Sequence, residues 1–173
     1  MTVVLNGAPR SGKSSIVAEL QDRGTGTWMN LGVDVSRRMT PPRDQPGIGL
    51  RPGEALRALT QVLYAALWES VAAHQRLGLN VAVDVGVYQA DIVEDAERRL
   101  AGLPVLRVAV RCPVDAIVER RRATGFPDDP ALAERWECVV HTHWRYDFEV
   151  ETSTATSAEC AAAILERLGT VPP

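Results

Sequence analysis

Lysine is almost absent from this chain of 173 residues. Lys13 is the only lysine, and the other 18 of the 19 basic residues are arginines. Arginine carries a wide planar fork, whereas lysine carries a compact charge on a thin stem. A loop wrapped around phosphates has room for the second group and not for the first. The scarcity of lysine elsewhere therefore argues that position 13 keeps it for such a site.

Cysteines are also few, and long apolar runs and an excess of positive charge are missing. Cys112, Cys138 and Cys160 include no C-x-x-C pair, which argues against a cysteine metal site and favours a reduced cytoplasmic setting. No apolar run approaches the roughly 20 residues of a membrane span, and we find no secretion signal. The net charge of −3 lacks the excess of positive charge that is typical of nucleic-acid-binding proteins. We therefore expect neither membrane nor nucleic acid as a partner, and the sequence leaves open whether a homo-oligomer forms.

The residues around Lys13 form the motif G-x-x-x-x-G-K-[ST]. An apolar run at 2–6 predicts a strand before it, and helical spacing at 14–20 predicts a helix after it, which is the context that the motif needs. Backbone N–H groups would face nucleotide phosphates, Lys13 would bridge the β- and γ-phosphates, and Ser14 would hold Mg²⁺. The plain alternative is a chance match between a strand and a helix. The predicted nucleotide-binding residues are Gly7, Ala8, Pro9, Arg10, Ser11, Gly12, Lys13, Ser14 and Ser15.

Strand patterns alternate with helix patterns along the rest of the chain. This alternation predicts one α/β domain over 1–173, with a mostly parallel sheet and helices on both faces. Ligands bind beyond the carboxyl ends of the strands in such sheets. Residues 35–52 are rich in proline and glycine and form a candidate lid or pocket wall. The predicted strands cover 2–6, 28–33, 81–83, 105–110 and 148–150, and the predicted helices 14–20, 53–77, 91–100, 113–122, 130–143 and 158–168.

Two aspartates that follow apolar runs are candidates for the chemistry. Asp34 follows the run 28–33 and could accept the proton of an attacking hydroxyl near the γ-phosphate. The alternative is an aspartate that caps a helical turn. Asp84 follows the run 81–83 and could hold Mg²⁺ together with Ser14. The alternative here is an ordinary aspartate after a buried strand.

Arginines beside a break in the helical pattern are candidates for stabilising the transferred phosphoryl group. Arg120, Arg121 and Arg122 precede a segment broken by glycine and proline, so 120–130 is a candidate flap, with Arg120 as the catalytic candidate. Arg135 is a further candidate. The alternative is that these arginines lie on a solvent-exposed helix face. At least one of the three consecutive arginines must do so, because consecutive helical residues point in different directions.

Several short runs, spread over nearly the whole chain, are distinctive as a set. They are Leu5-Asn6-Gly7, Gly32-Val33-Asp34, Val81-Ala82-Val83-Asp84, Val110-Arg111-Cys112, Val139-Val140-His141, Tyr146-Asp147-Phe148-Glu149-Val150 and Glu159-Cys160-Ala161. With them the chain resembles the chloramphenicol phosphotransferase family, small P-loop kinases that phosphorylate an antibiotic hydroxyl. The resemblance implies a three-layer fold with a five-stranded parallel sheet of nucleoside-kinase type, ATP with Mg²⁺, and Asp34 as general base.

The chain departs from that family in two places. The flap of the family usually reads Arg-Gly-Asp-Arg, whereas this chain has Thr124-Gly125-Phe126-Pro127-Asp128, so the flap arginine must come from Arg120 to Arg122 or from Arg135, or be absent. The loop at 36–52 differs in composition, and its arginines could suit an acceptor with a carboxylate or phosphate. They could equally be solvated charges. These loop arginines are Arg37, Arg38, Arg43 and Arg51.

The sequence as a whole predicts an ATP- and Mg²⁺-dependent phosphotransferase. Its acceptor would be a hydroxyl of an antibiotic-like small molecule, such as chloramphenicol or a related natural product, and its role resistance. One alternative is a metabolic kinase for nucleosides or sugar-like acids, and another is a nucleotide-dependent switch without an acceptor. The identity of the acceptor and the choice between ATP and GTP stay open, because fold analogy alone does not decide them.

Overall fold

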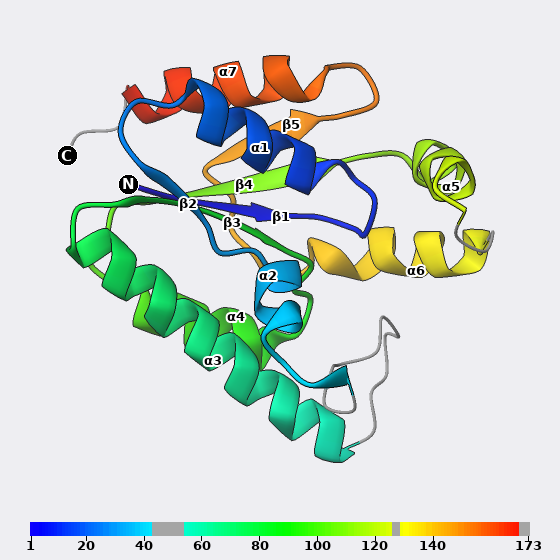
Figure 1. Cartoon of the computed structure of the whole chain (residues 1–173). Coiled ribbons are helices and arrows are strands. Elements are labelled where there is room, and N and C mark those ends of the chain that lie inside the picture. Colours follow the sequence, from blue (N-terminus) through cyan, green and yellow to red (C-terminus); the bar gives the residue numbers. More distant parts are fainter. Residues whose placement is uncertain (43–53, 126–128, 170–173) are drawn as a thin grey trace.

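Five parallel strands form one sheet in a computed structural model that describes residues 1–42, 54–125 and 129–169 (Figure 1). The strand order is β2-β3-β1-β4-β5, and every neighbouring pair is parallel. Parallel neighbours require crossover connections, which the intervening helices provide. The strands are β1 (Thr2–Asn6), β2 (Trp28–Asn30), β3 (Asn80–Val85), β4 (Val105–Arg111) and β5 (Phe148–Glu151).

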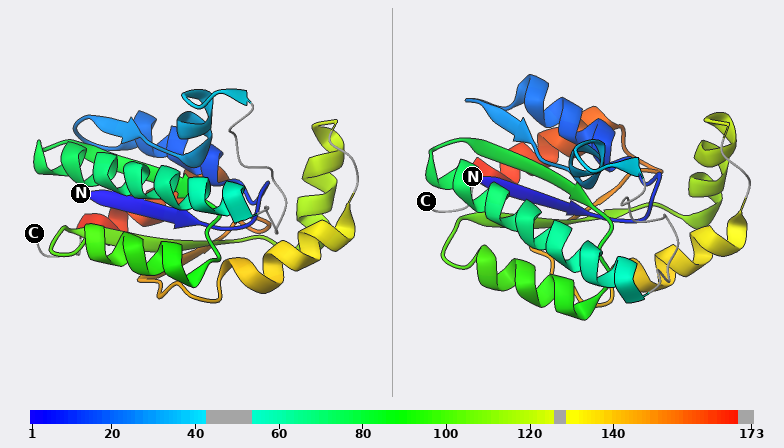
Figure 2. Two further views of the ribbon diagram at one scale, coloured as in Figure 1. Left: turned by 90° about the horizontal axis from the view of Figure 1, so that it is seen from below. Right: turned by 60° about the horizontal axis from the view of Figure 1, so that its bottom comes forward.

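Helices cover both faces of this sheet. Helices α1 (Lys13–Arg23) and α7 (Ser157–Gly169) pack together on one face, and α3 (Glu54–Arg76) and α4 (Ala90–Arg99) pack together on the other (Figures 1 and 2). This arrangement confirms the predicted three-layer fold. The remaining helices, α2 (Val33–Arg38), α5 (Val114–Ala123) and α6 (Pro130–Val140), lie toward the carboxyl ends of the strands (Figure 1).

The core explains why the strands are apolar without interruption. In β1, Val3 and Leu5 pack with α1 and α7, while Val4 points to the opposite face and packs with Trp68 of α3. A strand covered on both faces needs apolar residues at every position, unlike a strand with one face in water. Among the described residues, no helix combines the length and apolar character needed to cross a membrane.

Two predicted strand ends are wrong. The second strand stops at Asn30, because the Asn30 side-chain oxygen accepts a hydrogen bond from the Gly32 N–H (3.0 Å) and the chain then turns into α2. Asp34 therefore lies in the first turn of a helix and not at the end of a strand. The third strand continues through Asp84 to Val85, because β1 pairs with it that far.

The candidate lid at 35–52 and the candidate flap at 120–130 are only partly described. Residues 35–38 of the predicted loop belong to α2, and residues 43–52, with Arg43 and Arg51, lie outside the described residues. Residues 126–128 of the candidate flap lie outside them as well. The predicted helix at 130–143 is shorter than expected and ends at Val140.

Candidate active site

The loop between β1 and α1 has a backbone shape that particular residues make possible. Gly12 has φ 95°, and Arg10 has φ 71°, which is uncommon for a residue with a side chain. A Cβ on Gly7 would lie 2.5 Å from the Val110 carbonyl oxygen, so the loop can approach β4 only with glycine there. The first turn of α1 has no side-chain cap, so its N–H groups point to the place where a phosphate would bind.

Lys13 is folded back against its own loop. Its Nζ donates hydrogen bonds to the carbonyl oxygens of Gly7 (2.8 Å) and Ala8 (2.7 Å). Burial lowers the pKa of Lys13 to about 8, although the nearby carboxylates of Asp84 and Asp34 oppose that shift. The ammonium therefore lies at the centre of the candidate site, within electrostatic reach of both aspartates.

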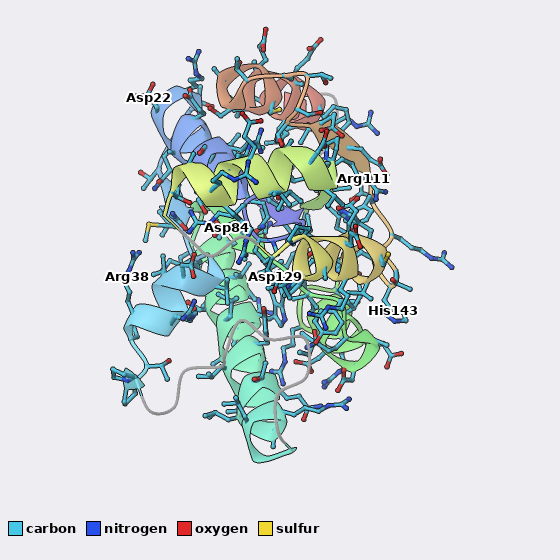
Figure 3. The ribbon with its side chains drawn as sticks, turned by 90° about the vertical axis from the view of Figure 1, so that its right-hand side faces the viewer. Asp22, Arg38, Asp84, Arg111, Asp129 and His143 are labelled. Atoms are coloured by element: carbon cyan, nitrogen blue, oxygen red, sulfur yellow. The ribbon has the colours of Figure 1, made fainter. Side chains whose placement is uncertain are left out.

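Ser14 and Asp84 form the strongest direct contact among the candidate residues. The Ser14 hydroxyl donates to Asp84 Oδ2 at 2.5 Å, and Asp84 is 6% exposed. The other carboxylate oxygen, Oδ1, packs against Gly32. A Cβ added to Gly32 would lie only 1.5 Å from this oxygen, so only glycine fits at this position. Asp84 thus connects the phosphate loop to the start of α2, and Figure 3 labels it at the centre of the carboxyl edge of the sheet.

The Ser14–Asp84 pair suits a small hard cation. Mg²⁺ prefers oxygen ligands and commonly binds to one or two protein groups together with substrate phosphates. Within the described residues there is no group of three or more His, Cys, Asp or Glu side chains placed to hold a metal. A hydroxyl and a carboxylate beside a phosphate loop meet the smaller requirement of a phosphate-bound Mg²⁺.

Asp34 occupies a different environment from Asp84. Its side chain is 68% exposed and forms a long ion pair with Arg37 (3.5 Å) one turn along α2. Gly32 is the N-cap of α2, and no side chain caps that helix, so the alternative of a capping aspartate does not apply. Exposed and near Lys13, the carboxylate of Asp34 is open to a ligand that reaches the phosphate loop.

A small apolar pocket lies beside Asp34, between α2 and α3. Sequence reasoning did not identify this pocket, because its leucines repeat at helical spacing and look like ordinary core positions. Burial raises the pKa of Tyr64 well above its usual range, with smaller contributions from Tyr88, Asp34 and Asp84. The pocket is lined by Val33, Ser36, Arg37, Thr40, Thr60, Leu63, Tyr64 and Leu67.

Arg120 contacts the phosphate loop from the side of β5. Its guanidinium donates to the Thr152 carbonyl oxygen (2.6 Å), to Thr152 Oγ1 (3.0 Å) and to the Arg10 carbonyl oxygen (3.4 Å). Thr152 Oγ1 in turn donates to the Ser11 carbonyl oxygen (2.7 Å). Sequence reasoning missed Thr152, whose only signal is its place just after a strand.

The other flap candidates lie differently. Arg121 is half-buried, and Arg122 and Arg135 are exposed. Arg135 donates to the Ala131 carbonyl oxygen of its own helix (3.2 Å). Of the four arginines, Arg120 has hydrogen bonds to the phosphate loop.

Comparisons with known proteins agree with this geometry. Residues 1–169 match a family described as chloramphenicol phosphotransferase-like protein. A Mycobacterium tuberculosis protein, provisionally named an O-phosphotransferase, is 24% identical over 98% of this chain and 83% of its own length.

Two solved structures have the same fold. The tunicamycin resistance protein of Deinococcus radiodurans has a TM-score of 0.71 at 17% identity, covering 99% of this chain and 98% of its own. Shikimate kinase of Acinetobacter baumannii, in complex with shikimate, has a TM-score of 0.70 at 14% identity, covering 98% and 93%.

The family match spans almost the entire chain, and some of the residues that carry the resemblance meet at this site. Gly32 and Asp84 touch at its centre, and Gly7 and Val110 meet beside them. The chain therefore belongs to the chloramphenicol phosphotransferase-like family of P-loop phosphotransferases.

Proposed function

We propose that this protein transfers the γ-phosphoryl group of ATP to a hydroxyl of an antibiotic-like small molecule. The observation that carries the proposal is the position of Asp34, exposed beside an apolar pocket and within electrostatic reach of Lys13. A base for an alcohol acceptor needs access to a bound molecule and a place near the transferred phosphate. Asp34 meets both requirements.

In the proposed reaction, Asp34 takes the proton of the acceptor hydroxyl. The hydroxyl oxygen forms a bond to the γ-phosphorus, the bond from that phosphorus to the bridging oxygen of ADP breaks, and ADP leaves with the electron pair. Lys13, with three N–H donors, keeps its hydrogen bond to the Gly7 carbonyl oxygen, exchanges the one to Ala8 for phosphate oxygens and stabilises their charge. Ser14 and Asp84 would hold Mg²⁺, which would offset the negative charge of the phosphates.

Arg120 is the proposed arginine for stabilising the phosphoryl group. Its hydrogen bonds to Thr152 and Arg10 keep it next to the phosphate loop. A guanidinium has five N–H donors, so Arg120 has donors left for a phosphate beside these bonds. Arg120 acts in this proposal from beside the loop, with or without movement of the flap.

The pocket between α2 and α3 is the proposed binding place for the body of the acceptor. Leucine, valine and tyrosine side chains line much of it, which favours an uncharged, partly apolar molecule. The likeness in fold to a tunicamycin resistance protein agrees with an antibiotic acceptor. A role in antibiotic resistance is part of this proposal.

Mass spectrometry of candidate acceptors tests the proposal. Chloramphenicol, other hydroxylated antibiotics, nucleosides and sugar-like acids would each be incubated with the protein, ATP and Mg²⁺. The proposal predicts a gain of one phosphoryl group on an antibiotic, lost in Asp34→Asn. Phosphorylation of antibiotics that persists at the same rate in Asp34→Asn would contradict the role of Asp34.

A metabolic kinase is the second candidate. Arg37 lines the pocket and suits a carboxylate on the acceptor, and the fold is shared with a shikimate kinase. In the same panel, a gain on a sugar-like acid or nucleoside alone would select this candidate. Slow ATP hydrolysis without any phosphorylated acceptor would instead favour a nucleotide-dependent switch.

A further inference from the structure

The residue just before the phosphate loop has an unusually complete set of hydrogen bonds. Asn6 is 0% exposed, and its Nδ2 donates to the carbonyl oxygens of Val140 (2.8 Å) and Val87 (3.2 Å) and to the Tyr146 hydroxyl (2.8 Å). Its Oδ1 accepts from the Val87 N–H (2.8 Å). These partners belong to three segments that are distant in sequence: the loop after β3, the end of α6 and the segment before β5.

Only an amide side chain satisfies this set. Asparagine offers N–H donors and a carbonyl acceptor without a charge. An aspartate would lose the donors and place a charge in a fully buried position, and an aliphatic residue would leave several polar groups without partners. Position 6 is therefore specified by its hydrogen bonds and not by strand packing.

Asn6 directly precedes Gly7, whose carbonyl oxygen accepts a hydrogen bond from Lys13 Nζ (2.8 Å). The Gly7 N–H donates to the Val85 carbonyl oxygen (3.3 Å), so both the side chain before Gly7 and its own N–H are tied to the chain around the end of β3. Gly86 lies between Val85 and Val87 in the same segment, and a Cβ on it would lie 3.3 Å from the Gly7 oxygen and 3.4 Å from the Trp136 ring of α6. The segment 85–87 thus holds the backbone around Gly7 in place.

We propose that Asn6 is a positioning residue for nucleotide binding, which orients the Gly7 carbonyl and through it holds the Lys13 ammonium where phosphates bind. This inference rests on the proposed function, because it assumes that Lys13 binds ATP. It adds a residue that touches neither the nucleotide nor the acceptor. It also connects the position of α6, which follows the candidate flap, to the phosphate loop.

The surrounding network does not titrate near neutral pH. The Tyr146 hydroxyl, which accepts from Asn6, is 2.8 Å from His141 Nδ1. Burial lowers the pKa of His141 to about 4 and raises the pKa of Tyr146 to about 12. Asp84, Asp34 and Cys112 are the groups that act on Lys13, and burial raises the pKa of Cys112. ATP binding by variants of this network can therefore be compared at neutral pH without a change in its protonation.

The test is calorimetric titration of the full chain with ATP and Mg²⁺ at neutral pH. Asn6→Ala should weaken ATP binding about tenfold, since a hydrogen bond to a charged group is lost or bent. Tyr146→Phe keeps the contacts of Asn6 with Val87 and Val140 and should bind ATP within about twofold of the wild type.

Thr2→Val is the matched control, because Thr2 is buried at the opposite end of the same strand and donates to Gln75 Oε1 (2.7 Å). It should lower the melting temperature as Asn6→Ala does, without changing ATP affinity. Equal effects of both variants on affinity, or no effect of Asn6→Ala, would overturn the inference.

Gly86→Ala places a Cβ 3.3 Å from the same carbonyl oxygen and serves if Asn6→Ala does not fold. It should weaken ATP binding, and unchanged binding would overturn the inference. A wild-type protein that binds no ATP would instead refute the proposed function, which separates the two failures.

Discussion

The phosphate-loop side of the site and the acceptor side differ in how their residues are held. On the first side, Lys13, Asp84 and Arg120 each have short hydrogen bonds to neighbouring segments. On the second side, α2 is a helix of six residues with no buried side chain, and Asp34 is mostly exposed. One side is fixed by many contacts, and the other rests on few.

This difference suits the two tasks of a phosphotransferase. Positioning and charge stabilisation at the phosphoryl group gain from a preorganised polar site. Acceptor recognition varies among members of one fold, and segments with few buried contacts can change without loss of the core. We therefore expect substitutions on the phosphate-loop side to affect ATP binding, and substitutions on the acceptor side to affect the acceptor step alone.

The largest effect should come from Lys13. Lys13→Met removes the charge that faces the phosphates, and turnover should fall on the order of 10³-fold. Lys13→Arg should not restore activity, because the planar fork does not fit among the Gly7 and Ala8 carbonyl oxygens. Steady-state kinetics on the phosphorylated acceptor measures both. A Lys13→Arg variant with wild-type turnover would contradict the idea that this loop requires a compact cation.

Asp34→Asn should lower turnover on the order of 10²-fold, because the amide cannot accept the proton of the acceptor hydroxyl. The KM for ATP should stay within about twofold, since Asp34 contacts no part of the phosphate loop. Asp22→Asn, at an exposed position of α1, is the matched control and should behave as the wild type. If both variants have the same turnover, Asp34 is not the base.

Gly32→Ala tests the contact between the two sides. The new Cβ would lie 1.5 Å from Asp84 Oδ1, so either Asp84 must turn away from Ser14 or α2 must move. We expect a loss of about 1–3 kcal/mol in the free energy of unfolding and a higher Mg²⁺ requirement. Gly169→Ala is the control, because a Cβ there meets nothing within 4 Å. Denaturant titration and Mg²⁺ dependence of turnover distinguish the two variants.

The pH dependence should distinguish Lys13 from the rest of the site. With a pKa of about 8 in the free protein, Lys13 loses its proton above that pH, and ATP affinity should fall about tenfold per pH unit there. The free energy of unfolding should change in the opposite direction. The unfolded chain, with its ordinary pKa of 10.5, binds the extra proton between pH 8 and 10.5, so this group makes folding more favourable as pH rises through that window. Over pH 7–10, the ATP affinity of the wild type should therefore fall while its free energy of unfolding gains from Lys13. Lys13→Met should show neither change.

The smallest effect should come from Arg135. It is exposed and bonded only within its own helix, so Arg135→Ala should change turnover less than about twofold. Arg120→Ala, by comparison, removes four contacts around Thr152, Cys112 and Arg10 and should raise the KM for ATP about tenfold. Equal effects of the two variants would place the flap arginine elsewhere.

The fold and the phosphate loop could be predicted from the sequence, because each depends on local patterns. The apolar runs predict the five strands. The glycine positions and Lys13 predict the phosphate loop. The start of α2 could not be predicted, since it depends on one hydrogen bond from Gly32 to Asn30 and on the approach of Asp84 to Gly32. Asp34 was accordingly expected at a strand end and lies in a helix.

The missed residues share a physical reason. Thr152 and Asn6 act through partners more than 70 residues away, and no spacing in the sequence indicates such contacts. The pocket residues of α3, such as Leu63, have the same apolar spacing as core residues, and only the position of α2 distinguishes them. Long-range contacts, and not composition, separate these residues from ordinary core positions.

ATP binding in the absence of any acceptor tests the separation of the two sides most directly. Calorimetry with ATP and Mg²⁺ would compare the wild type, Lys13→Met and Asp34→Asn. We predict that the wild type and Asp34→Asn bind with affinities within about twofold, and that Lys13→Met loses most of its affinity. Loss of ATP binding in Asp34→Asn as large as that in Lys13→Met would show that the two sides are one unit and would contradict this account.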